Sequence, residues 1–572
     1  MSSIPIIGNK VSHPADVVSD MGSNSLKGLK VTFINMPLRE NAKPNVAPEG
    51  PGILASIVRD YGADPYILDL NAYRIVDGRS IKQKLSNGRH MSYKEVEDLF
   101  LTHLEQVGEV DVVAFSGIIT TLRWQEQMAK IVKKHLPNCL LVSGNGLATE
   151  IKEGLFKWIP ELDAVAHSEG DDVILAICKD GKVIKEKGLQ RAIDTDSLTP
   201  YYKGELDGRH RFVYGGNRPK YLDSLPFAAW DLLENDPYGN NLLEWYINVP
   251  IWGTAANNSS ATPFTMDRSL STVSSRGCPY ACAFCYRGAQ GERNYGMRSA
   301  EHVATQAREY VDKYNIDFLG FVDDNFAVDK RRIDLLPKVF KDYGLDITWG
   351  THTRMDEADE RAFKMAEAGC VYIGFGAESA SEHTLTEMKK GGFILKNGMT
   401  PTKVNGKTYQ FPTTMVNAVK NCNAANIHAN CTWIMAYPGE ALEHLKTSVA
   451  FITWQQQYMT KGLTPGSDEY NIMFDSVNRK MFTATAYPGT AMFKDRRVRK
   501  LLTDNFGISF DPNGDPLIDD AFHTYVLELD DATKVLHNED GVPLNFGAMP
   551  MDTFLKAREH IDADQLENIL EM

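Results

Sequence analysis

Three cysteines stand close together in the middle of the chain. Cys278, Cys282 and Cys285 lie within eight positions, and thiolates at such short spacing bind zinc, copper or an iron-sulfur cluster. A structural zinc ion takes four protein ligands, yet the nearest histidines in the sequence, His210 and His302, are remote. Three thiolates on an iron-sulfur cluster leave one iron open to bind a small molecule. The spacing therefore favours such a cluster, while zinc with a distant fourth ligand stays open as an alternative.

The remaining cysteines are expected to be structural. Each stands alone in an apolar stretch, where a buried thiol behaves as a small hydrophobic side chain. They are Cys139, Cys178, Cys370, Cys422 and Cys431. So few cysteines in a long chain indicate a reducing compartment and not a disulfide framework, so the cytoplasm is the expected location.

The cysteine group follows the first of six segments with strand character. These segments are residues 271–277, 317–324, 347–353, 370–378, 429–437 and 480–487. Most are followed by a helical pattern, which predicts a partial (β/α)6 barrel over residues 266–495. Chemistry in such barrels occurs at the carboxyl ends of the strands, where the cysteines would lie. The polar stretch at 388–412 is expected to be a loop or hairpin insertion.

Short apolar runs also alternate with helical stretches over residues 28–190. This alternation predicts a doubly wound parallel sheet with helices on both faces. Small and polar residues follow the predicted strands, and ligands of open α/β sheets bind at these carboxyl-side loops. The candidate binding residues in the loops are Ser116, Thr120, Gly144, Asn145, Thr149, Glu169 and Gly170. The fold class is therefore α/β, with a sheet domain before a barrel.

Three other segments complete the predicted organisation. Residues 1–27 have no basic start followed by an apolar block and are expected to be a flexible tail. Residues 191–265 show poor periodicity and are interpreted as a linker. Residues 496–572 are acidic, end in a helical pattern and are expected to form a small, mostly helical region.

Composition restricts the partners of the chain. The 572 residues carry a net charge of −14 without a basic stripe, which argues against nucleic acid. No apolar run approaches the roughly 18 residues of a membrane span. A small-molecule substrate is the expected partner.

The cysteine spacing, with Phe284 before the last cysteine, resembles the radical SAM (S-adenosylmethionine) superfamily. Further resemblances follow the next three predicted strands, at Asp323, Asp324, Arg354, Glu378 and Ser379. The resemblance implies that the three cysteines hold a [4Fe-4S] cluster and that SAM binds its open iron. It also implies that Asp323 and Asp324 suit the SAM ammonium group and that Arg354 meets its carboxylate or ribose. In the pair Glu378 and Ser379, the acid would hydrogen-bond the ribose. Helix capping is the rival interpretation of the acidic residues.

Two turns near the end of the predicted barrel also resemble the family. Residues 437–440 match its Gly-x-Pro-Gly-Glu turn, except that Ala436 stands where glycine is usual. This exception puts a close backbone approach at that position in question. Residues 487–490 match a Pro-Gly-Thr turn that often ends the barrel.

The order of sheet and barrel is similar to the cobalamin-binding branch of this superfamily over roughly residues 28–495. Residues 225–233 resemble the Pro-x-x-Trp-Asp segment of that branch, with one extra residue before Trp230. The resemblance implies that the candidate loops of the first sheet surround cobalamin. Ordinary β/α turns are the competing interpretation. Residues 35–52 contain no histidine, so a lower cobalt ligand cannot come from that loop.

The leading hypothesis is a cobalamin-dependent radical SAM methyltransferase of a small molecule or natural product. One SAM would donate a methyl group, and another would yield a 5′-deoxyadenosyl radical, with electrons from a donor such as flavodoxin or ferredoxin. Same-family alternatives are a cobalamin-dependent cyclase or rearrangement enzyme, and an enzyme whose first domain no longer binds cobalamin. A non-catalytic metal-binding scaffold, such as a structural zinc protein, is the alternative from another class.

Overall fold

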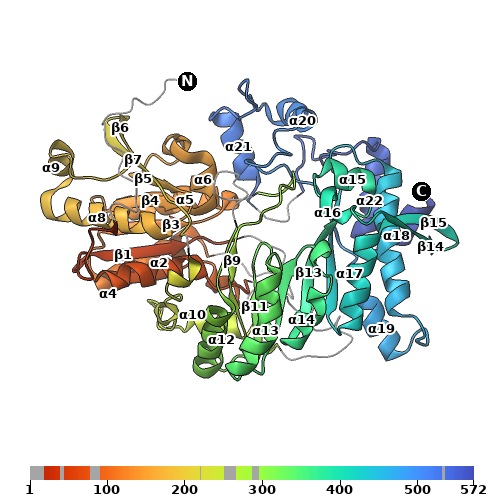
Figure 1. Ribbon diagram of the computed structural model, residues 1–572. Coiled ribbons are helices and arrows are strands. Elements are labelled where there is room, and N and C mark those ends of the chain that lie inside the picture. Colours follow the sequence, from red (N-terminus) through yellow and green to blue (C-terminus); the bar gives the residue numbers. More distant parts are fainter. Residues whose placement is uncertain are drawn as a thin grey trace. The chain divides into compact units, whose positions relative to one another are not determined.

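The computed structural model describes residues 18–38, 44–77, 91–219, 221–249, 266–286, 295–530 and 535–572. These residues form two compact units. The first unit holds the described residues of Met1–Tyr246 and Ile518–Lys534. The second unit holds those of Ile247–Arg287, Arg293–Leu517 and Val535–Met572. Each unit is built around its own sheet (Figure 1), and within the described ranges no helix has the length and apolar character to cross a bilayer.

The first unit contains a seven-stranded sheet in the order β2-β1-β3-β4-β5-β7-β6. Its strands are β1 (Lys30–Asn35), β2 (Asp64–Asp69), β3 (Val112–Ser116), β4 (Leu140–Gly144), β5 (Ala164–His167), β6 (Tyr202–Leu206) and β7 (Arg209–Gly215). All pairs are parallel except β6 with β7. The strand order reverses between β1 and β3, and such a switch point opens a crevice at the carboxyl ends of the strands. The predicted doubly wound sheet is confirmed.

Helices cover both faces of this sheet. They include α2 (Glu49–Asp60), α4 (Tyr93–Val107), α5 (Leu122–His135), α6 (Asn145–Ile151) and α8 (Asp171–Lys187). On one face Gly181 of α8 lies so close to β3 that an added Cβ would be 2.4 Å from the Val112 side chain. On the other face Thr32 of β1 shares a 2.9 Å hydrogen bond with His103 of α4. Successive strand residues point to opposite faces, so both sides of the sheet are buried.

Part of the segment interpreted as a linker belongs to the first sheet. Strands β6 and β7 form a hairpin whose turn residues, Asp207 and Gly208, have φ values of 53° and 70°. Two consecutive positive φ values favour Asp-Gly in a tight hairpin turn. Farther along, Trp230 and Tyr246 are buried in the first unit. Residues 250–265 of the same segment, and residues 1–17 of the expected tail, lie outside the described ranges.

The second unit contains a six-stranded parallel sheet in the order β17-β16-β13-β12-β11-β8. Its strands are β8 (Ser269–Thr272), β11 (Phe318–Phe321), β12 (Thr348–Thr353), β13 (Cys370–Glu378), β16 (His428–Met435) and β17 (Met481–Thr483). Each of the six predicted strand segments overlaps one of them. The connecting helices are α12 (Ala300–Tyr314), α13 (Lys330–Asp342), α14 (Arg361–Glu367), α17 (Thr413–Ala424) and α18 (Leu442–Met459). Neighbouring strands follow one another along the chain, so right-handed crossovers put these helices on one face, as in a partial barrel.

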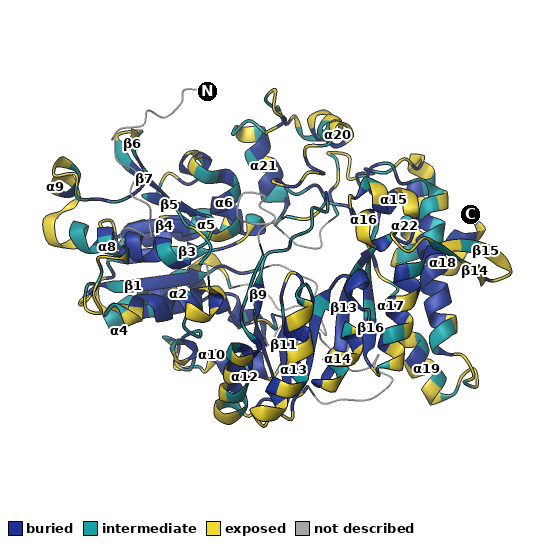
Figure 2. Ribbon diagram, in the orientation of Figure 1, coloured by how far each residue is buried: buried dark blue, intermediate teal, exposed yellow. Residues whose placement is uncertain are grey.

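The two faces of the second sheet differ in composition. One face is apolar and fully buried, with Leu319 paired to Trp349 in register. The other face has small and polar residues, with Gly320 paired to Gly350 and His352 paired to Gly374. Figure 2 shows buried strands and helices whose outer faces are exposed. The apolar face therefore packs under the helices, and the face with glycines and polar groups is the inner face of the partial barrel.

The insertion and the C-terminal region add small elements. Strands β14 (Met399–Val404) and β15 (Lys407–Pro412) form an antiparallel hairpin in the insertion. The C-terminal helices are α20 (Arg496–Phe506), α21 (Asp520–Glu528), α22 (Met551–Asp562) and α23 (Leu566–Glu571). Helix α21 belongs to the first unit, where Phe522 lies 5.5 Å from the Trp158 ring, and the other three belong to the second unit. Residues 496–572 are thus helical but divided between the two units.

Trp349 should be a main stabilising side chain of the second unit. It is 0% exposed, packs edge-on against Phe321 at 5.3 Å between ring centroids, and donates its indole N–H to the Ala368 carbonyl at 2.7 Å. Trp349→Ala should lower the free energy of unfolding by about 3–5 kcal/mol, since it leaves a large cavity. Phe363→Ala, at a ring that is 46% exposed, is the control and should change it by less than about 1 kcal/mol. Denaturant titration measures both, and equal effects would contradict this packing.

Candidate active site

The three cysteines lie on a loop at the carboxyl end of the second sheet. The loop follows β8 and the short β9 (Ser275–Arg276), and Gly277 turns the chain with a φ of 75°. All three thiols are free, with Cys278 and Cys282 half-buried and Cys285 exposed. The side chains are therefore available as ligands at the rim where barrel chemistry takes place.

Two distant segments hold the middle of this loop. The Ala283 N–H donates to the Met388 carbonyl at 2.8 Å, and the Ala283 carbonyl accepts from the Met492 N–H at 2.7 Å. Met388 follows β13, and Met492 follows the Pro-Gly-Thr turn after β17. In that turn the Thr490 hydroxyl donates to the Tyr487 carbonyl at 2.7 Å. The turn therefore positions the Met492 N–H, which donates to the cysteine loop.

Arg354 is brought to the cysteines by the end of β12. Its guanidinium donates to the Cys282 sulfur at 3.6 Å and to the Asp356 carboxylate at 2.9 Å. The guanidinium carbon also lies 4.0 Å from the centroid of the Tyr280 ring. A buried cation that is oriented by an acid and a ring is a strong partner for thiolate charge. The prediction that it binds SAM stays a prediction, because its contacts among the described residues are to groups of the protein itself.

The two predicted aspartates differ in environment. Asp323 is 3% exposed and accepts hydrogen bonds from the Ser274 N–H and hydroxyl, both at 2.6 Å, and from the Ser275 hydroxyl at 2.7 Å. It thus fixes the segment that leads into the cysteine loop. Asp324 is exposed at the rim. Of the two, Asp324 is the carboxylate that an added ligand can reach.

Asn325 is a site residue that the sequence interpretation missed. Its amide donates to the Cys278 sulfur at 3.9 Å and to the Glu357 carboxyl at 3.2 Å. Glu357 also accepts from the Tyr280 hydroxyl at 3.0 Å, and burial raises the pKa of this carboxyl. The sequence signal was present, because Asn325 directly follows the two aspartates. Only the fold shows that its side chain turns toward the cysteines.

Glu378 and Ser379 lie at the end of β13 but have different contacts. Glu378 has a φ of 64°, and its carboxyl lies 3.8 Å from the Lys390 ammonium, while burial raises its pKa. An added Cβ at Gly376 would come within 2.4 Å of the Glu378 carboxyl, so the glycine makes room for this acid. Ser379 is fully buried and exchanges a 3.1 Å hydrogen bond with Ser448. Glu378 therefore stays a ligand candidate, and Ser379 is engaged in packing this end of the strand.

Phe284 lies beside the same group. It is half-buried, with the Lys390 ammonium 5.8 Å from its ring centroid and the Tyr437 ring 6.4 Å away, edge to face. Lys390 comes from the segment that also binds Ala283. The structure thus brings Cys282, Cys285, Phe284, Arg354 and Glu378 to one rim, with Lys390 as a further residue that sequence reasoning missed.

The turn after β16 contains a strained alanine and a buried acid. Ala436 has a φ of 57°, the left-handed conformation that glycine adopts at low cost. Its N–H donates to one Glu440 carboxyl oxygen at 2.6 Å, and the other oxygen has no hydrogen-bond partner among the described residues. Burial raises the pKa of Glu440 to about 8. Ala436 therefore adopts a conformation that suits glycine, and Glu440 supports the turn.

Neutral polar groups follow the inner face of the second sheet. His352 and Asn430 are half-buried, and the Asn430 amide donates to the Tyr372 hydroxyl at 2.8 Å. Burial lowers the pKa of His352 to about 4, so this imidazole is neutral near pH 7. An added Cβ at Gly374 would come within 2.5 Å of His352, so the glycine leaves space for the ring. The inner face can thus make hydrogen bonds without bearing charge.

The candidate loops of the first sheet meet at its carboxyl edge. The Asn145 amide donates to the Ser116 hydroxyl at 3.1 Å, which joins the loops after β3 and β4. The Thr149 hydroxyl accepts from the Ser168 N–H at 3.0 Å, which joins α6 to the loop after β5. Asn145 is exposed with a φ of 72°, and Gly144 is half-buried. These loops therefore present backbone and small side chains along one edge.

Three further candidates lie at this edge with different surroundings. Glu169 pairs with Arg218 at 2.8 Å, so its charge is balanced within the unit. Thr120 is 6% exposed, and an added Cβ at Gly170 would touch Leu54 at 3.3 Å. Thr120 is therefore packed, Gly170 is half-buried like Ser116 and Gly144, and Asn145 is exposed.

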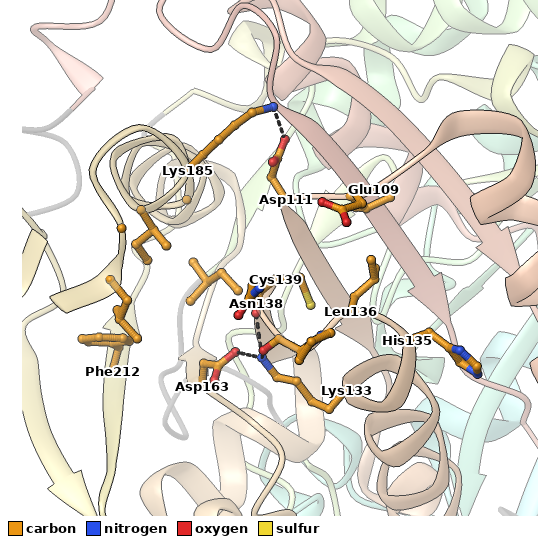
Figure 3. Close-up of a pocket in the computed structure, with 17 residues that line it drawn as sticks. Glu109, Asp111, Lys133, His135, Leu136, Asn138, Cys139, Asp163, Lys185 and Phe212 are labelled. Carbon is orange, nitrogen blue, oxygen red and sulfur yellow. Dashed lines mark hydrogen bonds and ion pairs between the residues drawn. The ribbon is translucent and has the colours of Figure 1, made fainter. Parts of the chain in front are cut away.

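A pocket of about 470 Å³ opens at the opposite edge of the first sheet (Figure 3). The Lys133 ammonium bonds Asp163 at 2.5 Å, and the Lys185 ammonium bonds Asp111 at 2.9 Å across it. These pairs tie α5 and α8 to the starts of the strands. Because α/β sheets bind ligands at the other edge, we interpret this pocket as a gap between packed elements.

The donor set at the cysteine rim fits an iron-sulfur cluster. In the described residues, no group of three or more His, Cys, Asp or Glu side chains converges as the ligands of a single ion. The three cysteines nevertheless share one loop, with a guanidinium and an amide donating to two of their sulfurs. Three soft thiolates with such neighbours suit a cluster, in which each cysteine binds a different iron.

Comparisons with known proteins agree with this geometry. The model of the radical SAM superfamily matches residues 272–452. An uncharacterized methyltransferase of Pyrococcus horikoshii is 25% identical over 490 residues, which cover 83% of this chain and 85% of that protein.

Two solved structures share the fold. OxsB, a cobalamin-dependent SAM radical enzyme with aqua-cobalamin and SAM bound, superposes with a TM-score of 0.57 and 16% identity over 86% of this chain and 63% of its own. The radical SAM methyltransferase TsrM from Kitasatospora setae, with cobalamin and a [4Fe-4S] cluster bound, gives 0.51 and 14% over 84% of this chain and 76% of its own. The match to OxsB thus spans less than two thirds of that enzyme. The predicted resemblance and the two-part α/β fold are confirmed.

Glu440 predicts a pH dependence of stability. An acid whose pKa is higher when folded binds its proton more tightly in the folded state, so stability is full below about pH 4.5 and falls as pH rises toward about 8. The loss should be roughly 3–5 kcal/mol in the full-length protein. Glu440→Gln should remove this part of the slope, since an amide stays neutral and still accepts from Ala436. Denaturant unfolding at pH 5 and pH 8 measures it. The exposed Glu443→Gln is the control, and a wild-type slope in Glu440→Gln would refute the assignment.

Proposed function

We propose that this chain, which carries a radical SAM domain over residues 272–452 and belongs to that superfamily, is a cobalamin-dependent methyltransferase of a small molecule. The observation that carries the proposal is the loop of three free cysteines at the rim of a parallel partial barrel. A doubly wound sheet precedes it, as in the OxsB and TsrM structures. The similar Pyrococcus horikoshii protein is a methyltransferase by name.

The cysteine rim is the proposed site of SAM cleavage. Cys278, Cys282 and Cys285 would hold a [4Fe-4S] cluster, which supplies the electron that splits SAM into methionine and a 5′-deoxyadenosyl radical. The protein's part is to hold the loop in place through Ala283 and to balance the sulfur charge with Arg354.

The residues beside the loop are the proposed SAM contacts. Glu378 and Lys390 offer an acceptor and a donor within one rim, which suits a ligand bearing hydroxyl, ammonium and carboxylate groups. Asp324 is an exposed acceptor for an ammonium group, and Phe284 offers an apolar ring. The neutral inner face with His352 and Asn430 would receive the substrate, because a reactive radical is best used where water is excluded.

The carboxyl edge of the first sheet is the proposed cobalamin site. Cobalamin would carry the methyl group between SAM and the substrate. Ser116, Gly144 and Asn145 leave backbone and small side chains accessible there, which permits close approach by a large, flat ligand. The remaining candidates, Thr120, Thr149, Glu169 and Gly170, would support these loops through the contacts described above.

We further propose that the electron comes from a flavodoxin or ferredoxin and that the enzyme works in the cytoplasm. Free cysteines, one of them exposed, support a reducing and electron-rich setting.

Cys282→Ala should abolish SAM cleavage, because the loop would lose one of three cluster ligands. We expect less than about 1% of wild-type 5′-deoxyadenosine after anaerobic reconstitution with iron and sulfide and reduction with dithionite. Iron and sulfide content should fall with it. Cys139→Ala, at a buried cysteine of the first unit, is the matched control and should keep both. Wild-type protein that carries zinc and no iron-sulfur signal would refute the proposed function.

Gly144→Leu should weaken cobalamin binding selectively. An added Cβ at Gly144 would meet the Phe115 carbonyl at 3.5 Å and the Ala166 carbonyl at 3.9 Å, both ordinary contacts, so the fold accepts a side chain that would project where the ligand should bind. We expect at least about tenfold weaker binding of hydroxocobalamin by visible spectroscopy, with unchanged 5′-deoxyadenosine production.

The control for this variant is Gly22→Leu, at an exposed glycine of the same unit that precedes β1. Gly22→Leu should bind like wild type. Equal affinity in wild type and Gly144→Leu would show that this edge is not the site.

In wild type with substrate, S-adenosylhomocysteine and 5′-deoxyadenosine should both form, and 5′-deoxyadenosine alone would favour cyclisation or rearrangement.

A further inference from the structure

The three cysteine sulfurs have unequal surroundings. Cys278 accepts a hydrogen bond from the Asn325 amide at 3.9 Å, and Cys282 accepts one from the Arg354 guanidinium at 3.6 Å. The Cys285 thiol instead faces the carbonyl of its neighbour Tyr286 at 3.6 Å. Asn325 therefore gives Cys278 an uncharged donor, in contrast to the cation beside Cys282.

The orientation of the Asn325 amide is determined by its neighbours. Its carbonyl oxygen accepts from the Thr353 hydroxyl at 2.7 Å, and its nitrogen donates to Glu357 at 3.2 Å. An inverted amide would place oxygen against oxygen at Glu357, which is unfavourable. The nitrogen therefore has to face the sulfur. Asn325 is also fully buried, so water does not compete for its donors.

The segment around Asn325 is rigid. The next residue, Phe326, packs against Trp349 at 5.3 Å and donates its N–H to the His352 carbonyl at 3.0 Å. Thr353 and Glu357 come from β12 and the turn after it, and their side-chain oxygens lie 2.6 Å apart. Asn325 is thus clamped between two strand ends, and its donor is aimed before any cofactor binds.

Adding an electron to an iron-sulfur cluster increases the negative charge on its sulfurs. A hydrogen-bond donor to a ligand sulfur stabilises that charge and raises the reduction potential. We propose that Asn325, held by Thr353 and Glu357, is a positioning residue that makes the cluster easier to reduce. This inference rests on the proposed function. The step is a one-electron reduction, with the electron supplied by a low-potential donor or dithionite and no bond formed or broken.

Asn325→Leu tests the inference, because leucine keeps the shape of asparagine without its donor. At a fixed potential the ratio of reduced to oxidised cluster should fall about tenfold, which is about 59 mV for one electron. Electron paramagnetic resonance during a redox titration of the anaerobically reconstituted full-length protein measures this. Asn325→Asp, which removes the donor and adds an acceptor, should shift the potential further in the same direction.

Two variants make the test decisive. Thr353→Val removes the hydroxyl that orients the amide and should give a smaller shift in the same direction. Asn421→Leu is the matched control, since its amide donates at 2.9 Å to the Ala358 carbonyl, and its potential should match wild type. If Asn325→Leu does not retain its cluster, the reduction potential of Thr353→Val is the test. A wild-type reduction potential in Asn325→Leu, or in Thr353→Val where it replaces it, would overturn this inference and leave the proposed function standing. Wild-type protein without a cluster would overturn it together with the proposed function.

Discussion

The two hydrogen bonds of Ala283 are the constraint on which the candidate active site depends. A loop with three cysteines has little stability of its own, and here its midpoint is held between a carbonyl that follows β13 and an N–H that follows β17. Met388 directly follows α15 (Glu382–Glu387), and Met492 follows the turn at residues 487–490, so segments of the second unit far apart in the sequence fix the loop. The buried aromatic group around Trp349 supports the sheet of this unit from the opposite face.

The charge of the hydrogen-bond donors differs from one cysteine sulfur to the next. Arg354 brings a full charge to one sulfur, Asn325 brings a neutral donor to another, and Lys390 lies beside the acid of β13. The inner face below the rim bears neutral groups such as His352. Such an arrangement places electrostatic stabilisation where electrons would arrive and keeps charge away from the proposed substrate space.

Particular residues show why some sequence interpretations hold and others need the fold. The six barrel strands were predictable because each is a short apolar run between turn and helix signals. Strands β6 and β7 were not, because their polar sequence has weak alternation and the pairing of β7 with β5 is a long-range contact. Residues 496–572 were expected to be mostly helical, yet the place of α21 in the first unit depends on contacts such as Phe522 with Trp158.

The sequence by itself determined the group of candidate ligands, because three thiols within eight positions are visible without a fold. It also determined the order of a wound sheet and a partial barrel. Only the tertiary structure decided which of three consecutive residues reaches a cysteine. Asp323 binds the serines before the loop, Asp324 is exposed, and Asn325 faces Cys278. The reason is geometric, since side-chain direction at a strand end is set by the packing of neighbouring strands.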